Sequence, residues 1–239
     1  PSLDAAAQSF GGLVHANDGL VTPAIADIFP GTLMALGVVS AMHSAQRSGK
    51  GQFLDVGMYD AMMALQKSAV AQYGFTGKPN PAGLQRAMTL YPFDLFPTQD
   101  GRIAIAVGQP RHWDLLCAAM ERADLMEDER SFSNEARLAN VDWVEAQICA
   151  WTQTQTRAEI MAKLDGAIPI GPVQTMADIY ADPHVQARGM LETCSPAGDN
   201  PDIALAASPI KFSVTPTTLY QRPPTLGEHN AEVLAEFGI

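Results

Sequence analysis

A long apolar run, which begins at Pro30 and holds no lysine, arginine, aspartate or glutamate as far as about His43, constrains the fold of this chain most. Proline fits the first turn of a helix, where its missing N–H is not needed, so the run predicts a helix that begins at Pro30. Asp27 stands just ahead of this helix among alanine and isoleucine residues. We therefore expect a carboxylate that is not freely solvated and that faces the positive end of the helix dipole. Spacing alone favours a helix cap over a functional carboxylate.

Composition indicates a globular protein with a sizeable core. The 239 residues are 47% hydrophobic and 17% charged, enough for one large domain or two small ones. The formal net charge of -11 argues against nucleic acid or an anionic membrane as the main partner. It leaves room for an anionic ligand in a locally positive pocket.

Cysteine and histidine spacing predicts neither disulfides nor a metal site. Three widely spaced cysteines without a CxxC pair are typical of a reduced, cytoplasmic protein. The five histidines form no metal-binding pattern. The apolar stretch Leu33–Met42 is too short to span a bilayer, and we expect no signal peptide. Because the chain begins at Pro1, on the approach to a helix, we expect sequence upstream of it to be missing.

The order of predicted elements is that of an α/β protein, although the pattern does not fix the topology. The Asp-Gly pair in Thr98–Gly101 predicts a hairpin turn, Thr156 and Glu159 predict a capping box, and the segment 78–83 is a turn-rich linker. We predict helices at 3–10, 30–43, 58–73, 110–122, 131–138, 141–152, 156–165, 176–181, 183–188 and 228–237, and strands at 52–56, 90–96, 102–107, 168–173, 190–193 and 210–214.

Common catalytic motifs are absent. The basic loop Arg47–Gly51 could cradle a phosphate, but it is not a Walker loop, and a solvated helix end is the simpler interpretation. There is no GxGxxG dinucleotide fingerprint and no GxSxG nucleophile elbow. Cys117 and Cys149 are expected to be core residues.

Five stretches in a characteristic order resemble the family III CoA-transferases, the CaiB–BaiF family, over essentially the whole chain. The first is an acidic–Ala–Gln–Gly segment at 3–12. The second, at 25–60, contains Asp27, the apolar helix and the Gly-Lys-Gly turn that follows it. The others are a hairpin at 91–101, a return segment at 168–189 and a C-terminal helix at 227–234.

The resemblance implies a function and a set of site residues. It implies transfer of CoA from an acyl-CoA thioester to a free carboxylic acid (EC 2.8.3 type), with Asp27 as the nucleophile that becomes an aspartyl-CoA thioester. Met58 matches a position that lines the CoA thiol end, and Leu3 a position beside the pantetheine arm. Gly83 lies where the family carries a mobile glycine-rich loop, although this chain has only one glycine there.

Two alternatives stay open. The family also contains 2-methylacyl-CoA racemases, which resemble the transferases but carry a histidine and a glutamate where this chain has Leu3 and Pro97. Neither residue can move a proton at neutral pH, which favours transfer; deuterium exchange at C2 would reveal a racemase. The other alternative is a non-catalytic CoA-thioester-binding fragment, which turnover without a partner would exclude.

The resemblance also implies an architecture. We expect an α/β, family III CoA-transferase fold: part of a Rossmann-like large domain at 1–78 with the nucleophile and a linker helix, a small α+β domain at 79–189, and a return to the large domain at 190–239. An interlocked homodimer is implied, with a missing N-terminal half or a partner chain. CoA is expected as substrate, with no metal, nucleic acid or membrane partner. Oxalate, succinate, carnitine-type acids and branched dicarboxylates all remain open as acceptors.

Overall fold

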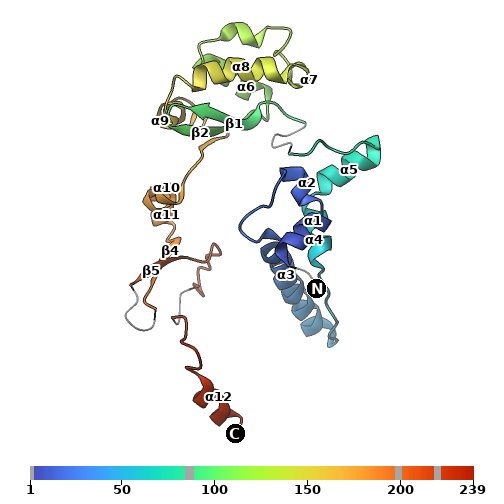
Figure 1. Ribbon diagram of the computed structural model, residues 1–239, viewed down its shortest axis with the longest axis vertical. Coiled ribbons are helices and arrows are strands. Elements are labelled where there is room, and N and C mark those ends of the chain that lie inside the picture. Colours follow the sequence, from blue (N-terminus) through green and yellow to red (C-terminus); the bar gives the residue numbers. More distant parts are fainter. Residues whose placement is uncertain (1–2, 84–88, 197–200, 218–221) are drawn as a thin grey trace. The chain divides into compact units, whose positions relative to one another are not determined.

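The computed structural model describes residues 3–83, 89–196, 201–217 and 222–239, which are drawn in colour in Figure 1. The chain divides into two compact units, Pro1–Gly171 and Pro172–Ile239. The predicted three-part division at 78 and 189 stays a prediction.

The first unit begins with five helices: α1 (Asp4–Phe10), α2 (Leu13–Asn17), α3 (Ile25–Ser48), α4 (Met58–Leu65) and α5 (Lys67–Thr76). Helices α1, α3 and α4 contact one another (Figure 1). Ala7, Ala26 and Met62 form a small buried cluster between them. The partly buried residues packed against this cluster are Leu13, Ile25, Phe29 and Met58.

Helix α3 begins five residues earlier than its sequence predicts. Its first residue is Ile25, so Pro30 lies inside the helix and is buried. An internal proline leaves the carbonyl of the residue four positions earlier, Ala26, without its helical partner. The helix nevertheless begins at Ile25, because the Asp4 side chain of α1 accepts a hydrogen bond from the N–H of Ala26 in its first turn. The helix also extends five residues beyond its predicted end at 43. It stops at Ser48, inside the loop Arg47–Gly51 that the sequence indicates as a helix end, and Gly49 follows in the left-handed conformation.

Helix α3 is also long and apolar enough to cross a membrane, by length and composition only. It has 24 residues, a mean hydropathy of 1.6 in its most apolar window, and 11% of that window buried. The prediction from Leu33–Met42 therefore underestimates the length of the apolar helix, which is long enough to span a bilayer. The core helix of a globular protein passes the same test, so this finding is weak evidence for a membrane.

Two predictions that follow α3 are wrong in detail. Residues 52–56 form no strand in the described structure, and Phe53 is exposed. A strand is defined by its hydrogen-bonded neighbour, and this segment has none among the described residues. The predicted helix at 58–73 is two helices, α4 and α5, which meet at Gln66. Only α4 has buried residues, Ala61 and Met62.

The second part of this unit is a three-stranded sheet with helices. The strands β1 (Phe93–Thr98), β2 (Gly101–Ala106) and β3 (Ile170–Pro172) lie in the order β1-β2-β3. The first two form the predicted hairpin, in which Thr98 pairs with Gly101. The helices are α6 (Pro110–Ala119), the 3₁₀ turn η1 (Ala123–Met126), α7 (Asn134–Ala139), α8 (Val141–Thr152) and α9 (Arg157–Leu164), with α6, α7 and α8 on one side of the hairpin in Figure 1.

The largest core of the molecule lies between this sheet and its helices. Phe96 pairs with Ile103 across the hairpin, and both side chains are buried. Trp113, Leu116, Leu125, Val144, Ile148, Ile160 and Leu164 are buried in the same cluster. The capping box of α9 is present, because Thr156 and Glu159 each bond the other's backbone N–H.

The second unit contains the remaining elements: α10 (Met176–Ala181), α11 (Pro183–Ala187), β4 (Leu191–Cys194), β5 (Ile203–Ala206) and α12 (Asn230–Glu236). Strands β4 and β5 pair antiparallel. The predicted strand at 210–214 is wrong: these residues form no strand, and the partner of β4 is the earlier segment Ile203–Ala206. Valine and isoleucine at 210–214 raised its strand propensity, but pairing with β4 decides which segment is a strand.

Candidate functional site

Asp27 lies in the first turn of α3, as its third residue. Its side chain is exposed, which contradicts the expectation of a shielded carboxylate. The reason is helical geometry: Ala26 and Pro30, one turn apart, are the buried residues, and Asp27 is rotated from Ala26 by about 100° around the axis. The backbone N–H of Asp27 donates to the carbonyl of Ala24 at 3.1 Å. Among the described residues, its carboxylate takes no hydrogen bond or ion pair. Asp27 thus presents an accessible carboxylate at the positive end of a helix dipole.

Asp27 is not the helix cap. The N-cap residue of α3 is Ala24, which has no side-chain acceptor. The cap comes instead from α1, where Asp4 Oδ1 accepts a hydrogen bond from the backbone N–H of Ala26 at 2.9 Å. Asp4 thereby satisfies one of the N–H groups that a helix leaves free at its start. The structure therefore assigns the cap to Asp4, and the role of Asp27 as a nucleophile stays a prediction.

Gln8, also on α1, completes this arrangement. Its side chain is fully buried and donates from Nε2 to Asp4 Oδ2 at 2.8 Å. It also bonds both backbone groups of Val21, in the loop that leads to α3. The acidic–Ala–Gln–Gly segment contains both residues, but its sequence does not show that Asp4 reaches α3 and Gln8 the loop before it.

Two of the predicted binding residues lie around the same helices. Met58 is the first residue of α4 and packs against the cluster that includes Ala26, next to Asp27 in sequence. Leu3 precedes α1, is 80% exposed, and is adjacent to Asp4. The structure therefore brings Leu3, Met58 and Asp27 to one group of three packed helices. Their roles toward CoA stay predictions.

Gly83 belongs to a different contact. Its N–H donates to the carbonyl of His15 at 3.1 Å, and its φ of +65° is one that glycine adopts without strain. A Cβ at this position would meet Asp18 at 2.9 Å. No described contact joins Gly83 to Asp27, and its role over the reaction site stays a prediction.

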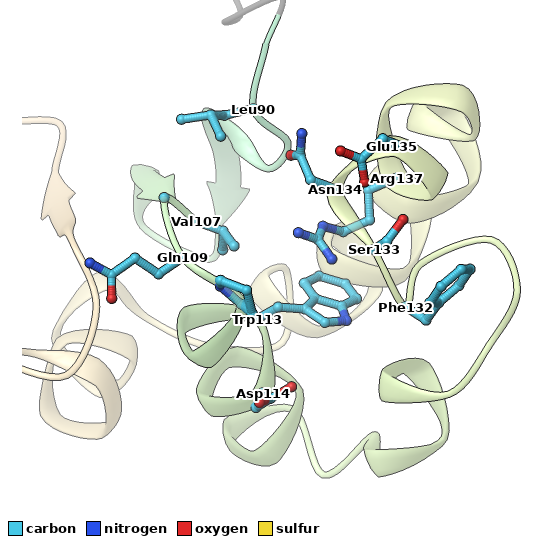
Figure 2. A pocket seen from close by; sticks show the side chains of 12 residues that line it. Leu90, Val107, Gln109, Trp113, Asp114, Phe132, Ser133, Asn134, Glu135 and Arg137 are labelled. Atoms are coloured by element: carbon cyan, nitrogen blue, oxygen red, sulfur yellow. The ribbon is translucent and has the colours of Figure 1, made fainter.

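A cavity of about 300 Å³ lies in the hairpin part of this unit, and Figure 2 shows its lining. Arg137 on α7 reaches into this region beside Trp113 and is only 3% exposed. Its Nε donates to the carbonyl of Tyr91 and its Nη1 to that of Ser131, at 2.7 and 2.8 Å. Burial lowers the pKa of Arg137, yet guanidinium stays charged at any physiological pH. Through these two hydrogen bonds, Arg137 connects the backbone at Tyr91 to the backbone at Ser131.

The cysteines and histidines give no sign of a metal centre in the part of the chain that the structure describes. No group of three metal-ligating residues occurs there. Burial raises the pKa of Cys117 to about 12, with a smaller contribution from Asp114. Its thiol is therefore protonated at neutral pH and is a poor nucleophile.

The fold and the family comparison agree. The family model for CoA-transferase family III matches residues 1–230, and the chain belongs to this family. It is similar to the solved structure of a CaiB/BaiF family protein from Brucella suis, with a TM-score of 0.79 and 30% identity over 98% of this chain and 62% of that one. The fold class expected from the sequence is thereby confirmed.

Relatives with assigned activities are also similar to the chain. It is 38% identical to a succinyl-CoA:mesaconate CoA-transferase of Haloarcula hispanica, over 100% of this chain and 61% of that protein. It is 35% identical to a succinate–glutarate CoA-transferase of Agrobacterium fabrum, over 89% of this chain and 53% of that protein. The chain thus spans less than two thirds of the length of these relatives.

Proposed function

We propose that the protein containing this chain transfers CoA from an acyl-CoA thioester to a free carboxylic acid, with Asp27 as the covalent carrier. The observation that carries the proposal is the exposed Asp27 carboxylate in the first turn of α3, in a chain of this family. An ionised carboxylate is a usable nucleophile, and the positive end of a helix dipole favours its charge. Exposure gives a bulky thioester access to it.

The chemistry balances without a metal, a redox partner or a net proton. The Asp27 carboxylate attacks the thioester carbonyl, the C–S bond breaks, and CoA departs as a thiolate. The product on the protein is a mixed anhydride of Asp27 and the donor acid. The thiolate attacks the Asp27 carbonyl carbon, which releases the donor acid and forms the aspartyl-CoA thioester. The acceptor carboxylate then attacks this thioester, and the displaced thiolate attacks the acceptor's acyl carbon. The new acyl-CoA leaves, and the Asp27 carboxylate is regenerated.

The named relatives suggest the substrates to try first. Their names contain succinyl-CoA or succinate on one side and the dicarboxylates mesaconate and glutarate on the other. We therefore propose succinyl-CoA as donor and a small dicarboxylic acid as acceptor. We also propose that the protein is a homodimer and that it is cytoplasmic.

The test is chemical trapping on the full-length protein. The protein is incubated with succinyl-CoA, treated with hydroxylamine or borohydride, digested, and analysed by mass spectrometry. We expect a modification on the peptide that contains Asp27, and its loss in Asp27→Asn. An Asp27→Asn protein with full transferase activity would refute the role of Asp27.

Asp142→Asn is the matched control. Asp142 is also an exposed aspartate in the first turn of a helix, α8, and lies outside the three-helix group that carries Asp27. Both changes remove one negative charge near a helix N-terminus, so they carry a similar electrostatic penalty for the helix. We expect the adduct and the transfer rate to be unchanged in Asp142→Asn.

A further inference from the structure

The side-chain amide of Gln8 has only one orientation that satisfies its surroundings. Val21 N–H donates to Oε1 at 2.9 Å, and Nε2 donates to the Val21 carbonyl at 2.9 Å. Because a backbone N–H only donates and a carbonyl only accepts, a flipped amide would lose both bonds. The remaining N–H of Nε2 must then face Asp4, where it donates to Oδ2. The loop before α3 and the carboxylate of Asp4 are thereby tied to one buried side chain.

Asp4 connects the Gln8 side chain to the first turn of α3. With Oδ2 held by Gln8, its Oδ1 accepts the N–H of Ala26, the residue before Asp27. Ala26 is fully buried, so solvent does not compete for this N–H. Helix α3 has no side-chain cap of its own. Both the approach to the first turn and the turn itself are thus attached to α1.

We propose that the Asp4–Gln8 clamp, meaning these two side chains with their bonds to Val21 and Ala26, positions Asp27 for attack on the thioester. This inference rests on the proposed function. Asp4 and Gln8 act through the backbone of α3 and are positioning residues, because their polar atoms are occupied by protein groups. Covalent catalysis depends on the nucleophile being held in a near-attack geometry, and small displacements are costly.

A clamp that only stabilises the fold makes a different prediction from one that positions a nucleophile. Loss of a helix cap destabilises the protein modestly wherever the cap lies. Loss of positioning lowers the rate of the chemical step and leaves substrate binding nearly unchanged. The distinguishing measurement is therefore the rate of adduct formation at saturating acyl-CoA, compared with the KM for acyl-CoA.

The experiment compares Asp4→Ala, Asp4→Asn and Gln8→Glu with Thr156→Ala in the full-length protein. Thr156 caps α9 in the hairpin part, so its replacement removes a cap without touching α1 or α3. For Asp4→Ala we expect adduct formation to slow roughly 10- to 100-fold, with KM changed by less than about threefold. Thr156→Ala is expected to react at the wild-type rate.

The two conservative variants test the clamp atom by atom. In Asp4→Asn the acceptor for Ala26 N–H is retained, but an NH₂ group then faces Nε2 of Gln8, so we expect a partial loss of rate. In Gln8→Glu a carboxylate faces the Asp4 carboxylate and the Val21 carbonyl, so we expect a loss comparable to Asp4→Ala. Should Asp4→Ala fail to fold, these two variants decide the question.

Amide hydrogen exchange at Ala26 gives a readout that does not depend on activity. The clamp predicts faster exchange at Ala26 in Asp4→Ala and unchanged exchange there in Thr156→Ala. Wild-type rates of adduct formation in Asp4→Ala and Gln8→Glu, or unchanged exchange at Ala26, would overturn the inference. Absence of any adduct in the wild type would instead count against the proposed function, and the exchange at Ala26 would then decide whether the clamp exists.

Discussion

Gly11 and Met62 approach so closely that a Cβ on residue 11 would overlap the Cβ of Met62. Gly11 ends α1, and Met62 is buried at the centre of the three-helix cluster. The contact therefore holds α1, with Asp4 and Gln8, against α4. Gln66 adds to it by donating from Nε2 to the carbonyl of Gly11.

This contact predicts that Gly11→Ala destabilises the protein. One methyl group inserted at a filled position costs about 1–3 kcal/mol in the free energy of unfolding. Gly74→Ala is the control, because Gly74 lies within α5 and a Cβ there meets no atom within 4 Å. It should be neutral or stabilise by about 0.5–1 kcal/mol. Urea denaturation of the two variants measures both, and equal effects would contradict the close contact.

Arg137→Met is predicted to destabilise strongly. It leaves the carbonyls of Tyr91 and Ser131 without the guanidinium donor, at a cost of about 1–3 kcal/mol for each acceptor that finds no new partner. Arg130→Met is the matched control: Arg130 also lies over a tryptophan, Trp143, and pairs with Asp128, but its side chain is 45% exposed. We expect about 1 kcal/mol or less for Arg130→Met by the same denaturation measurement.

The Cys117 thiol is predicted to be unreactive in the folded protein. Its pKa is raised to about 12, mainly by burial, and the side chain is fully buried. Peptide mapping after iodoacetamide treatment at pH 8 should find Cys117 unmodified in the native protein and modified in urea. Rapid native labelling at pH 8 would show that the core around Cys117 opens readily.

The raised pKa of Cys117 also predicts that the protein loses stability at alkaline pH. The folded pKa of Cys117 is above its unfolded value of about 9, so folding favours the protonated thiol. The stabilisation is complete below pH 9 and is lost as the pH rises toward 12. The free energy of unfolding should fall over this window, and Cys117→Ala should lack that part of the decrease. Identical pH profiles for the two proteins would contradict the assignment.

Local signals predicted much of the hairpin part correctly. The Asp-Gly pair predicted the turn between β1 and β2, and Thr156 with Glu159 predicted the start of α9. Both signals act over a few residues, so a short stretch of sequence contains all that they need. The position of Asp27 just ahead of Pro30 is a local signal of the same kind.

Interactions between distant residues caused the errors. Helix α3 begins at Ile25 because Asp4, twenty-two positions from Ala26, supplies its cap. The partner of β4 is Ile203–Ala206 instead of 210–214, and 52–56 forms no strand without a neighbour among the described residues. For α3 and β4 a contact from elsewhere in the chain decided the outcome, and for 52–56 the lack of a neighbouring strand among the described residues did.

The amino-acid sequence by itself determined the family, most helices, the hairpin and the identity of the candidate nucleophile, because these depend on local chemistry and on the order of motifs. Only the tertiary structure decided that Asp27 is exposed and is not the cap, and that Asp4 and Gln8 hold the turn that carries it. The physical reason is that a free N–H at a helix start can be satisfied by any acceptor that the fold brings to it. Here that acceptor comes from another helix, and the Asp27 carboxylate is left without a partner among the described residues.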